Sequence, residues 1–303
     1  MTELQMDFIG VTTGDSLITR VFPRWAQMLD LPTHRLVGHD VTVDAPLPVH
    51  RRLIEAIKHN PASAGALVTT HKISVYEAAA ELFDELDDDA RMFGEISCIA
   101  NRDGRMTGYA KDPLTAQLSL DELLTAEHFG ANPDSAVLCF GTGGAGLAIT
   151  TCLGRRQIPP TAIICTDVSP ARLAHAQAIH RAAGPNALRY DYVPGDAATS
   201  AALLASLPAA SVVVNATGLG KDRPGSPLPE DVLFPERSVV WDLNYRGDLR
   251  FLTDARRQQA ARKLTLADGW RYFVHGWSQA IAEVFDVEIT TDTVEALALA
   301  AAG

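Results

Sequence analysis

A glycine-rich turn is the feature that most limits what this chain of 303 residues can fold into. Gly141, Gly143 and Gly146 form a GxGxxG pattern that follows the apolar run AVLCF and opens the helical stretch LAITTCLG. The next apolar run, TAIICTD, completes a strand, helix, strand unit, in which the two strands are expected to be parallel. The pattern therefore predicts a dinucleotide-binding fold, with a pyrophosphate held at the N-terminus of the helix.

Each glycine of the pattern has its own physical reason. The first permits a tight turn, the second lets the pyrophosphate approach the backbone, and the third lets helix and strand pack closely. A purely structural turn is the alternative, because Gly-rich turns are common. The residues expected to bind the cofactor here are Gly141, Thr142, Gly143, Gly144, Ala145 and Gly146.

An acidic residue ends the second strand of this unit. Asp167 lies 167 − 146 = 21 residues past Gly146, close to where an acid binds the ribose hydroxyls and repels a 2′-phosphate. NAD is therefore expected as the cofactor, with NADP less favoured. The alternative is a solvated acid at the end of a strand.

The rest of the chain continues this α/β rhythm. Apolar runs at SVVVNAT, SVVWDLN and KLTLADG predict later strands of the same sheet. Before the glycine turn, the runs DFIGV, RLVGHDVTV and GALVTT alternate with helical stretches, and Arg102-Asp103-Gly104 predicts a hairpin. We predict an α/β domain over residues 1–113, a Rossmann domain over 114–269, and helices over about 270–303 that pack back on the first domain, with an Ala-rich end that frays.

Composition excludes several classes of function. With 26 Lys and Arg against 37 Asp and Glu, the net charge is −11, and no basic stripe is present, so nucleic acid is not an expected partner. The first residues lack the pattern of a secretory signal, and no apolar run is long enough for a membrane span, so a cytoplasmic protein without membrane contact is expected. The four cysteines show no CxxC spacing and predict buried free thiols rather than a metal site.

Five short segments, in order along residues 7–285, resemble those of shikimate dehydrogenases. GALVTTHK (65–72) resembles their GxNVTxPxK segment, and MTGYAKD (106–112) resembles their GxNTD segment. GTGGAG resembles GAGGA, VVNATGLG (213–220) resembles NATxxGM, and WDLNY (241–245) resembles DxxY. Each segment alone is weak evidence, but five in the right order make the resemblance fairly specific.

The resemblance implies an N-terminal substrate domain facing a C-terminal Rossmann domain across a cleft, with hydride passing between nicotinamide and a ring carbinol or ketone. It also implies that Lys72 and Asp112 are the catalytic pair, since an acid or base must move the hydroxyl proton as hydride leaves. A solvated Lys72 and an Asp112 that only caps the following helix are the alternatives. The resemblance adds Asn215, Ala216, Thr217 and Gly218 to the cofactor residues.

The substrate segments depart from the family pattern. The family's SxSP segment aligns with GDSLIT, which keeps Ser16 but has Ile18 at the second serine. The asparagine of the GAVNT segment aligns with Ser97 of GEISC, and Thr69 or Thr70 is left to supply a hydroxyl in GALVTTHK. Such changes predict a different substrate, because a site built for hydroxyls rejects ligands that leave its polar groups unpaired. Ser97 and Thr70 doing the same work through water is the alternative.

The remaining substrate residues are less well aligned. The family has a glutamine seven residues after a glycine, whereas here the nearest glutamine after Gly269 is Gln279. Trp277 beside it would suit a more apolar ligand. Tyr245 matches the family's tyrosine near the cleft, although core packing is an alternative. Gln279 and Tyr245 complete the predicted substrate residues.

Two other functions remain open at this point. A methylene-tetrahydrofolate dehydrogenase type also has a Lys-bearing first domain and a Rossmann domain, but Asp112 argues against it. A non-catalytic NAD-binding sensor is the other, and the presence of both Lys72 and Asp112 argues against it. We expect an oxidoreductase that acts on a small cyclic substrate; a homodimer is left open.

Overall fold

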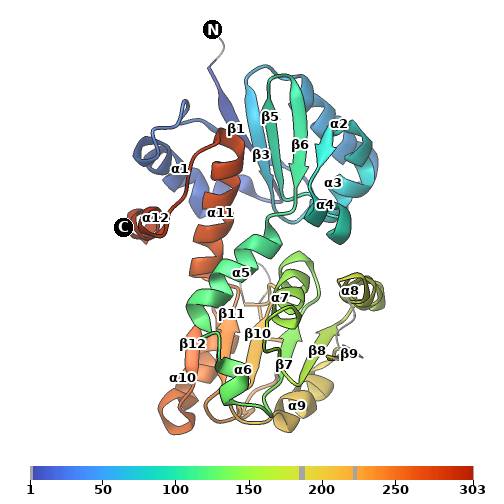
Figure 1. Cartoon of the computed structure of the whole chain (residues 1–303), viewed down its shortest axis with the longest axis vertical. Helices are drawn as coiled ribbons and strands as arrows, with labels where there is room; N and C mark the ends of the chain where they lie inside the picture. The colour runs from blue at the N-terminus through green and yellow to red at the C-terminus, as the bar shows by residue number, and fades with distance from the viewer. Residues whose placement is uncertain (1–2, 184–187, 221–223, 303) are drawn as a thin grey trace. The chain divides into compact units, whose positions relative to one another are not determined.

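The computed structural model describes residues 3–183, 188–220 and 224–302 (Figure 1). The chain divides into two compact units: Met1–Thr115 with Val274–Gly303, called unit 1, and Ala116–Phe273, called unit 2. Each unit contains a six-stranded sheet. The α/β class expected from the sequence is confirmed.

The sheet of unit 1 is mixed and has the strand order β2-β1-β3-β5-β6-β4. β1 pairs in parallel with β2 and β3, whereas β5 pairs antiparallel with β3 and β6. The hairpin predicted between β5 and β6 is confirmed, and Asp103 and Gly104 both have positive φ, as such turns require. The strands are β1 Gln5–Gly10, β2 Leu36–Asp40, β3 Ser63–Val68, β4 Glu85–Leu86, β5 Cys98–Arg102 and β6 Arg105–Tyr109.

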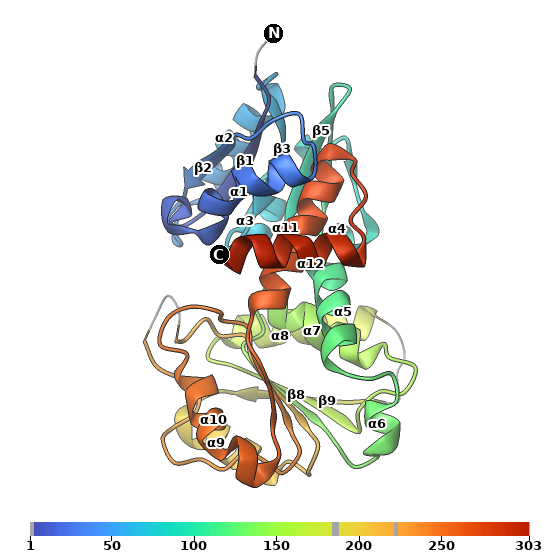
Figure 2. The ribbon, with the colours of Figure 1, turned by 90° about the vertical axis from the view of Figure 1, so that its left-hand side faces the viewer.

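Helices cover both faces of this sheet (Figures 1 and 2). On one face α2 packs beside α3, over a core that includes Ile9, Ile54, Val68 and Val75. α1 packs against α12. The helices are α1 Leu17–Met28, α2 Leu47–His59, α3 Lys72–Ala79, α4 Asp88–Phe93, the part of α11 (Trp270–Phe285) from Val274 on, and α12 Thr291–Ala302; 3₁₀ turns span Thr13–Asp15 and Ala80–Leu82.

The expectation that the Ala-rich end frays is wrong up to Ala302. This segment forms α12, and Leu297 on it is fully buried. The indole of Trp25 donates to the Leu297 carbonyl at 3.0 Å, and the Arg24 guanidinium donates to the Ala300 carbonyl at 3.1 Å. Contacts with α1 therefore hold the end of the chain.

The sheet of unit 2 has the order β12-β11-β10-β7-β8-β9, and its strand pairs are parallel throughout. Counted along the unit, this order is 6-5-4-1-2-3, which is the Rossmann arrangement. The runs predicted as strands around and after the glycine turn are confirmed. The strands are β7 Val137–Phe140, β8 Ala162–Asp167, β9 Arg189–Pro194, β10 Val212–Asn215, β11 Val239–Asp242 and β12 Thr265–Ala267.

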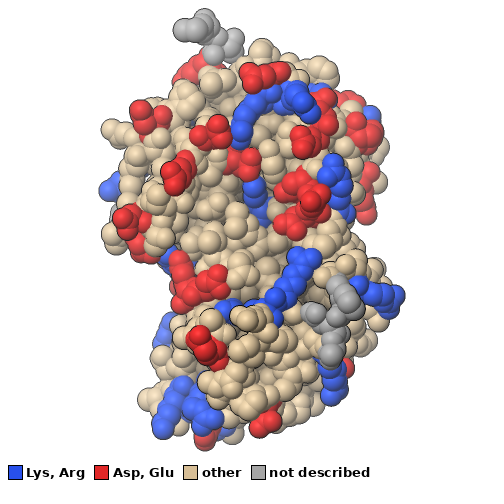
Figure 3. Space-filling view, in the orientation of Figure 1, with Lys and Arg blue, Asp and Glu red and all other residues tan. Residues whose placement is uncertain are grey.

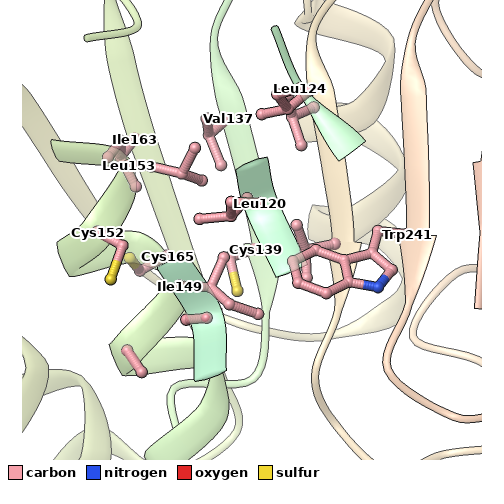
Figure 4. Packing of buried hydrophobic residues seen from close by; sticks show 14 of the residues in the cluster. Leu120, Leu124, Val137, Cys139, Ile149, Cys152, Leu153, Ile163, Cys165 and Trp241 are labelled. Atoms are coloured by element: carbon pink, nitrogen blue, oxygen red, sulfur yellow. The ribbon is translucent and has the colours of Figure 1, made fainter. Parts of the chain in front are cut away.

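Two cores lie on the two faces of this sheet. Val137 and Cys139 face the cluster drawn in Figure 4, whereas Leu138 and Phe140 face a second cluster that contains Phe251. This alternation follows from the two-residue period of a strand, and burial on both faces explains why the strand is apolar throughout. The helices are the part of α5 (Asp112–Leu123) from Ala116 on, α6 His128–Ala131, α7 Gly144–Gly154, α8 Pro170–Ala182, α9 Ala197–Ser206, α10 Arg250–Arg262 and the first turn of α11, up to Phe273; residues 112–115 of α5 belong to unit 1.

The states of the cysteines and the distribution of charged side chains match what the sequence predicts. All four cysteines are free and buried, as predicted. Figure 3 shows Lys and Arg side chains interspersed with Asp and Glu side chains over the visible face of each unit. No helix in the described part of the chain combines the length and the hydropathy needed to cross a bilayer.

Candidate active site

The structure brings together the two residues predicted as a catalytic pair. Lys72 is the first residue of α3, shortly after β3, and Asp112 is the first residue of α5, shortly after β6. The Lys72 ammonium donates to both carboxylate oxygens of Asp112, with 2.5 Å between Nζ and Oδ1. Their side chains are only 19% and 8% exposed. Two residues 40 positions apart thus form one largely buried ion pair.

The surroundings favour the charged form of this lysine. Burial lowers the pKa of Lys72, but the carboxylates of Asp112 and Glu95 outweigh burial, so the pKa is raised above its usual value. Lys72 therefore carries an ammonium group at neutral pH, which is the form that can donate a proton.

Glu95 forms a charged cluster with Lys72 and Asp112, and the sequence analysis did not identify it. It follows α4, is 1% exposed, and its Oε1 atom has no hydrogen-bond partner. The amide of Ile96 donates to the Lys72 carbonyl at 3.0 Å, which ties the two segments together. Burial first, and Asp112 second, raise the pKa of Glu95 to about 8, and Lys72 opposes them. The only signal in the sequence was a charged residue in the run FGEISC.

A buried histidine pair supports the start of α3. The distance from His50 Nε2 to His71 Nδ1 is 3.1 Å, and His71 Nε2 lies 2.9 Å from the Val41 carbonyl oxygen. Burial lowers the pKa of His71, so its imidazole stays neutral and can donate to that carbonyl. The residue before Lys72 is thereby fixed in place.

The predicted substrate hydroxyls of unit 1 differ in the hydrogen bonds that they make within the protein. Thr69 Oγ1 donates to the Ile9 carbonyl at 3.2 Å. Ser97 Oγ accepts from the Lys111 amide at 2.6 Å, so this hydroxyl is already used to hold the segment before Asp112. Ser16 precedes α1 without a side-chain capping bond, and Thr70 is exposed.

The other predicted substrate residues do not all belong to one unit. Gln279 is half-buried on the unit 1 part of α11, and Trp277 on the same helix packs edge-on against Phe8 at 4.9 Å between ring centroids. Trp277 is 5% exposed, so it is a core residue of unit 1. Tyr245 belongs to unit 2, where its ring lies 4.8 Å from that of Phe273.

The glycine turn of unit 2 has the geometry that a dinucleotide needs. Gly141 has φ +90°, and a Cβ there would lie 2.7 Å from the Ala216 carbonyl oxygen. A Cβ on Gly146 would lie 2.0 Å from the Gly141 carbonyl oxygen, so helix and strand can pack only without a side chain. A Cβ on Gly143 would meet nothing within 4 Å. The space beside Gly143 is therefore open at the N-terminus of α7, the kind of position at which backbone amides can bind a phosphate.

Asp167 braces this turn from the end of β8. Its Oδ2 accepts from the Thr142 amide at 2.8 Å and from the Thr142 hydroxyl at 3.1 Å, and its Oδ1 accepts from the Ser169 amide at 2.9 Å. Asp167 is 6% exposed, unlike a solvated strand-end acid, whereas the side chain of Val168 after it is 84% exposed.

The turn after β10 lies beside the glycine turn. Asn215 Oδ1 accepts from the amide and the hydroxyl of Thr217, and Asn215 Nδ2 donates to Asp242 at 3.1 Å. Gly218 has φ +75°. Burial raises the pKa of Asp242 to about 6. Since the strand order reverses between β7 and β10, this is the switch point at which Rossmann domains bind ligands.

Two curated relatives of this chain carry the same name. A shikimate dehydrogenase (NADP(+)) of Symbiobacterium thermophilum is 32% identical over 229 residues, which cover 74% of this chain and 72% of the relative. A shikimate dehydrogenase (NADP(+)) of Thermococcus kodakarensis is 29% identical over 180 residues, covering 59% of this chain and 58% of the relative. No protein-family model matches the chain.

Solved structures share the fold. A shikimate dehydrogenase in complex with NADP+ superposes with a TM-score of 0.74 at 19% identity, over 98% of this chain and 94% of the other. A quinate dehydrogenase from Corynebacterium glutamicum in complex with NAD gives a TM-score of 0.71 at 20% identity, over 98% of each chain.

Proposed function

The chain belongs to the shikimate dehydrogenase family and is an NAD(P)-dependent oxidoreductase, and we propose that it interconverts a secondary alcohol and a ketone on a small cyclic substrate. The observation that carries this proposal is the buried ion pair of Lys72 and Asp112. Ketone reduction needs a proton donor at the carbonyl oxygen, and alcohol oxidation needs a group that takes the hydroxyl proton. The pair can serve both directions.

In ketone reduction, the Lys72 ammonium donates a proton to the substrate oxygen as negative charge develops on it, while Asp112 holds Nζ in place. In alcohol oxidation, the neutral amine of Lys72 takes the hydroxyl proton as hydride leaves the carbinol carbon. Bound NAD(P) supplies or accepts that hydride. Because the pKa of Lys72 is raised, reduction is favoured at neutral pH and oxidation at alkaline pH.

We propose a shikimate-like or quinate-like substrate other than plain shikimate. Ile18 stands at a hydroxyl position of the family pattern, and its buried aliphatic side chain has no group that could donate to a carboxylate. Ser97 stands at an asparagine, and its hydroxyl is bound to the Lys111 amide. Each unpaired ligand group costs about 1–3 kcal/mol, so two losses should lower kcat/KM for shikimate by a factor between about 30 and about 10⁴ relative to a member with the full pattern.

We propose NAD as the preferred cofactor of unit 2, although the named relatives are NADP(+) enzymes. The support is the Asp167 carboxylate at the end of β8, the position at which a Rossmann fold commonly has an acid for the ribose hydroxyls, so that a 2′-phosphate would meet like charge. Val168 follows it, and an apolar side chain offers a phosphate no hydrogen bond.

We assign the substrate and catalytic roles to residues 1–113 with the helices of about 270–303, and cofactor binding to residues 114–269. Lys72 and Asp112 support the first assignment, and the open turn at Gly143 supports the second.

Turnover of a panel of cyclic alcohols and ketones tests the proposed function. Shikimate, quinate and related alcohols are offered with NAD and with NADP at alkaline pH, and the corresponding ketones with NADH and NADPH at neutral pH. We expect reduction or oxidation of at least one member, with shikimate among the poorest. A protein that binds the cofactor but turns over no cyclic alcohol or ketone would contradict the proposal.

A further inference from the structure

A third ionisable side chain, outside the pair of Lys72 and Asp112, lies in the same cluster. Glu95 is 1% exposed, and its Oε1 atom is buried without a hydrogen-bond partner. Buried carboxyl oxygens are normally paired, so an unpaired one calls for a physical reason. In the alignment of GEISC with the family's GAVNT segment, Glu95 stands at the alanine. The family pattern therefore does not account for it.

We propose that Glu95 is a positioning residue of the dehydrogenase site, which acts through Lys72 and keeps the Lys72 ammonium charged at alkaline pH. The proposal rests on the proposed function only where it concerns catalysis. Its geometric basis is the backbone bond from the Ile96 amide to the Lys72 carbonyl, which fixes Glu95 beside the lysine. Because Glu95 is buried, it acts on Lys72 by charge rather than by touching the substrate.

The charges around Glu95 define how it acts. The charges that act on it are those of Lys72 on α3, of Asp112 on α5, and of Asp87 and Asp89 at the start of α4. Burial and these three acids favour a protonated carboxyl, and only Lys72 favours the carboxylate, so the pKa of Glu95 is raised to about 8. On alkalinisation Glu95 thus loses its proton before Lys72 does, and its new negative charge then stabilises the ammonium.

The consequence is a preference for one direction of reaction. A carboxylate that forms above about pH 8 delays the loss of the Lys72 proton, so the proton donor for ketone reduction persists into the alkaline range. The same delay holds back alcohol oxidation, which needs the neutral amine. Glu95 therefore biases the site towards the reduction of a ketone.

The Lys72 midpoint can be measured directly by NMR in the ligand-free full chain. The sequence contains five lysines, so protein labelled with carbon-13 at Cε gives few signals, and Lys72→Arg identifies the signal of Lys72. We expect Glu95→Gln to lower the titration midpoint of Lys72 by about one pH unit. Glu85→Gln is the matched control, because it removes a carboxylate of the same unit that is exposed and pairs with Arg105. This control should leave the midpoint unchanged.

Two outcomes would overturn the proposal. One is a folded Glu95→Gln protein in which Lys72 titrates as in the wild type. The other is found in the wild type itself, with glutamate labelled at the side-chain carboxyl carbon: a Glu95 midpoint above that of Lys72 would leave Glu95 uncharged in the range where Lys72 loses its proton. This second measurement stands even where the variant does not fold.

A kinetic experiment distinguishes a failure of this proposal from a failure of the proposed function. With a cyclic alcohol that turns over, the rise of the oxidation rate with pH should begin about one unit lower in Glu95→Gln than in the wild type or in Glu85→Gln. If Glu95→Gln lowers the oxidation rate equally at every pH and does not shift its pH dependence, the role of Glu95 is only structural. If no substrate turns over, the proposed function fails, while the NMR titration still decides the role of Glu95.

Discussion

The proposed ligand sites of units 1 and 2 are built in different ways. In unit 2 the proposed cofactor site depends on backbone geometry: side chains at Gly141 and Gly146 would collide with carbonyl oxygens, whereas the space beside Gly143 is open. In unit 1 the site consists of side chains from separate elements, with Lys72 on α3 and Asp112 on α5. Backbone geometry restricts the residue type strictly, whereas side-chain sites change when the ligand changes.

This contrast explains why the two halves diverge differently from the family pattern. The order and spacing of the glycines in unit 2 agree with a general dinucleotide fingerprint. Unit 1 keeps its ion pair but replaces hydroxyl and amide groups, at Ile18 and Ser97 among others. A constant chemical step and a changed ligand would produce this combination.

The largest expected effect separates chemistry in unit 1 from binding in unit 2. Lys72→Ala should lower kcat by about 10³-fold, the usual loss for a positioned acid or base, while the Kd for NAD stays within about twofold. Lys58→Ala is the control, because Lys58 also pairs with an acid of unit 1, Asp84, but lies outside the site. Steady-state kinetics and calorimetric titration measure the two quantities. An equal loss in both lysine variants would assign the effect to stability.

Acid should destabilise unit 2 through His180. This ring is bonded to the Thr150 and Tyr192 hydroxyls and stacked on Tyr190, and burial lowers its pKa from 6.5 to about 4. The neutral form is favoured in the folded state, so its contribution is complete above pH 6.5 and is lost as the pH falls towards 4.

Comparison with His180→Gln isolates this contribution. The difference in unfolding free energy between wild type and variant should shrink by about 3 kcal/mol between about pH 7.5 and pH 4. Asp242 has a pKa raised to about 6 and opposes the trend, but it is present in both proteins and cancels. Urea denaturation across this pH range measures the difference, and a constant difference would mean that the fold does not lower the pKa of His180.

Two alanine substitutions in the glycine turn should separate folding from cofactor binding. Gly146→Ala brings a Cβ against the Gly141 carbonyl and should lower the unfolding free energy by about 2 kcal/mol. Gly143→Ala meets open space, so the fold should keep its stability while the Kd for NAD rises about tenfold. Thermal unfolding and calorimetry distinguish the two, and equal destabilisation by both variants would refute the account of the turn.

The smallest effect concerns the choice between the two cofactors. Asp167→Asn should lower the ratio of NAD affinity to NADP affinity by about tenfold, about 1.4 kcal/mol, because the repulsion of a 2′-phosphate is lost. Asp191→Asn is the control, since it removes a charge from the next strand, β9, where Asp191 pairs with Arg189. If the wild-type protein binds NADP more tightly than NAD, Asp167 does not have the proposed role at the ribose.

The sequence predicted those parts of the molecule that local patterns determine. Strands buried on both faces are apolar throughout, so β7, β8, β10 and β11 could be predicted, and the Asp-Gly pair predicted the hairpin. The pairing of Lys72 with Asp112 was predicted from the family resemblance and not from a local pattern.

Features that depend on tertiary contacts could not be predicted in this way. The Ala-rich end is held against α1 because Trp25 and Arg24, far away in sequence, donate to its carbonyl groups. Glu95 gained its significance only when the fold buried it beside Lys72. The use of the Ser97 hydroxyl by the Lys111 amide likewise depends on the pairing of β5 with β6.

The buried thiols allow the local opening of each unit to be measured in the natural sequence. Cys98 lies in unit 1 and the other three cysteines lie in unit 2, all without a disulfide. Burial raises the pKa of Cys98 and raises that of Cys165 to about 12, so neither is a reactive thiolate in the folded state. A thiol reagent will therefore modify each residue only when its surroundings open, and mass spectrometry of timed samples will give separate opening rates for the two units without any engineered probe.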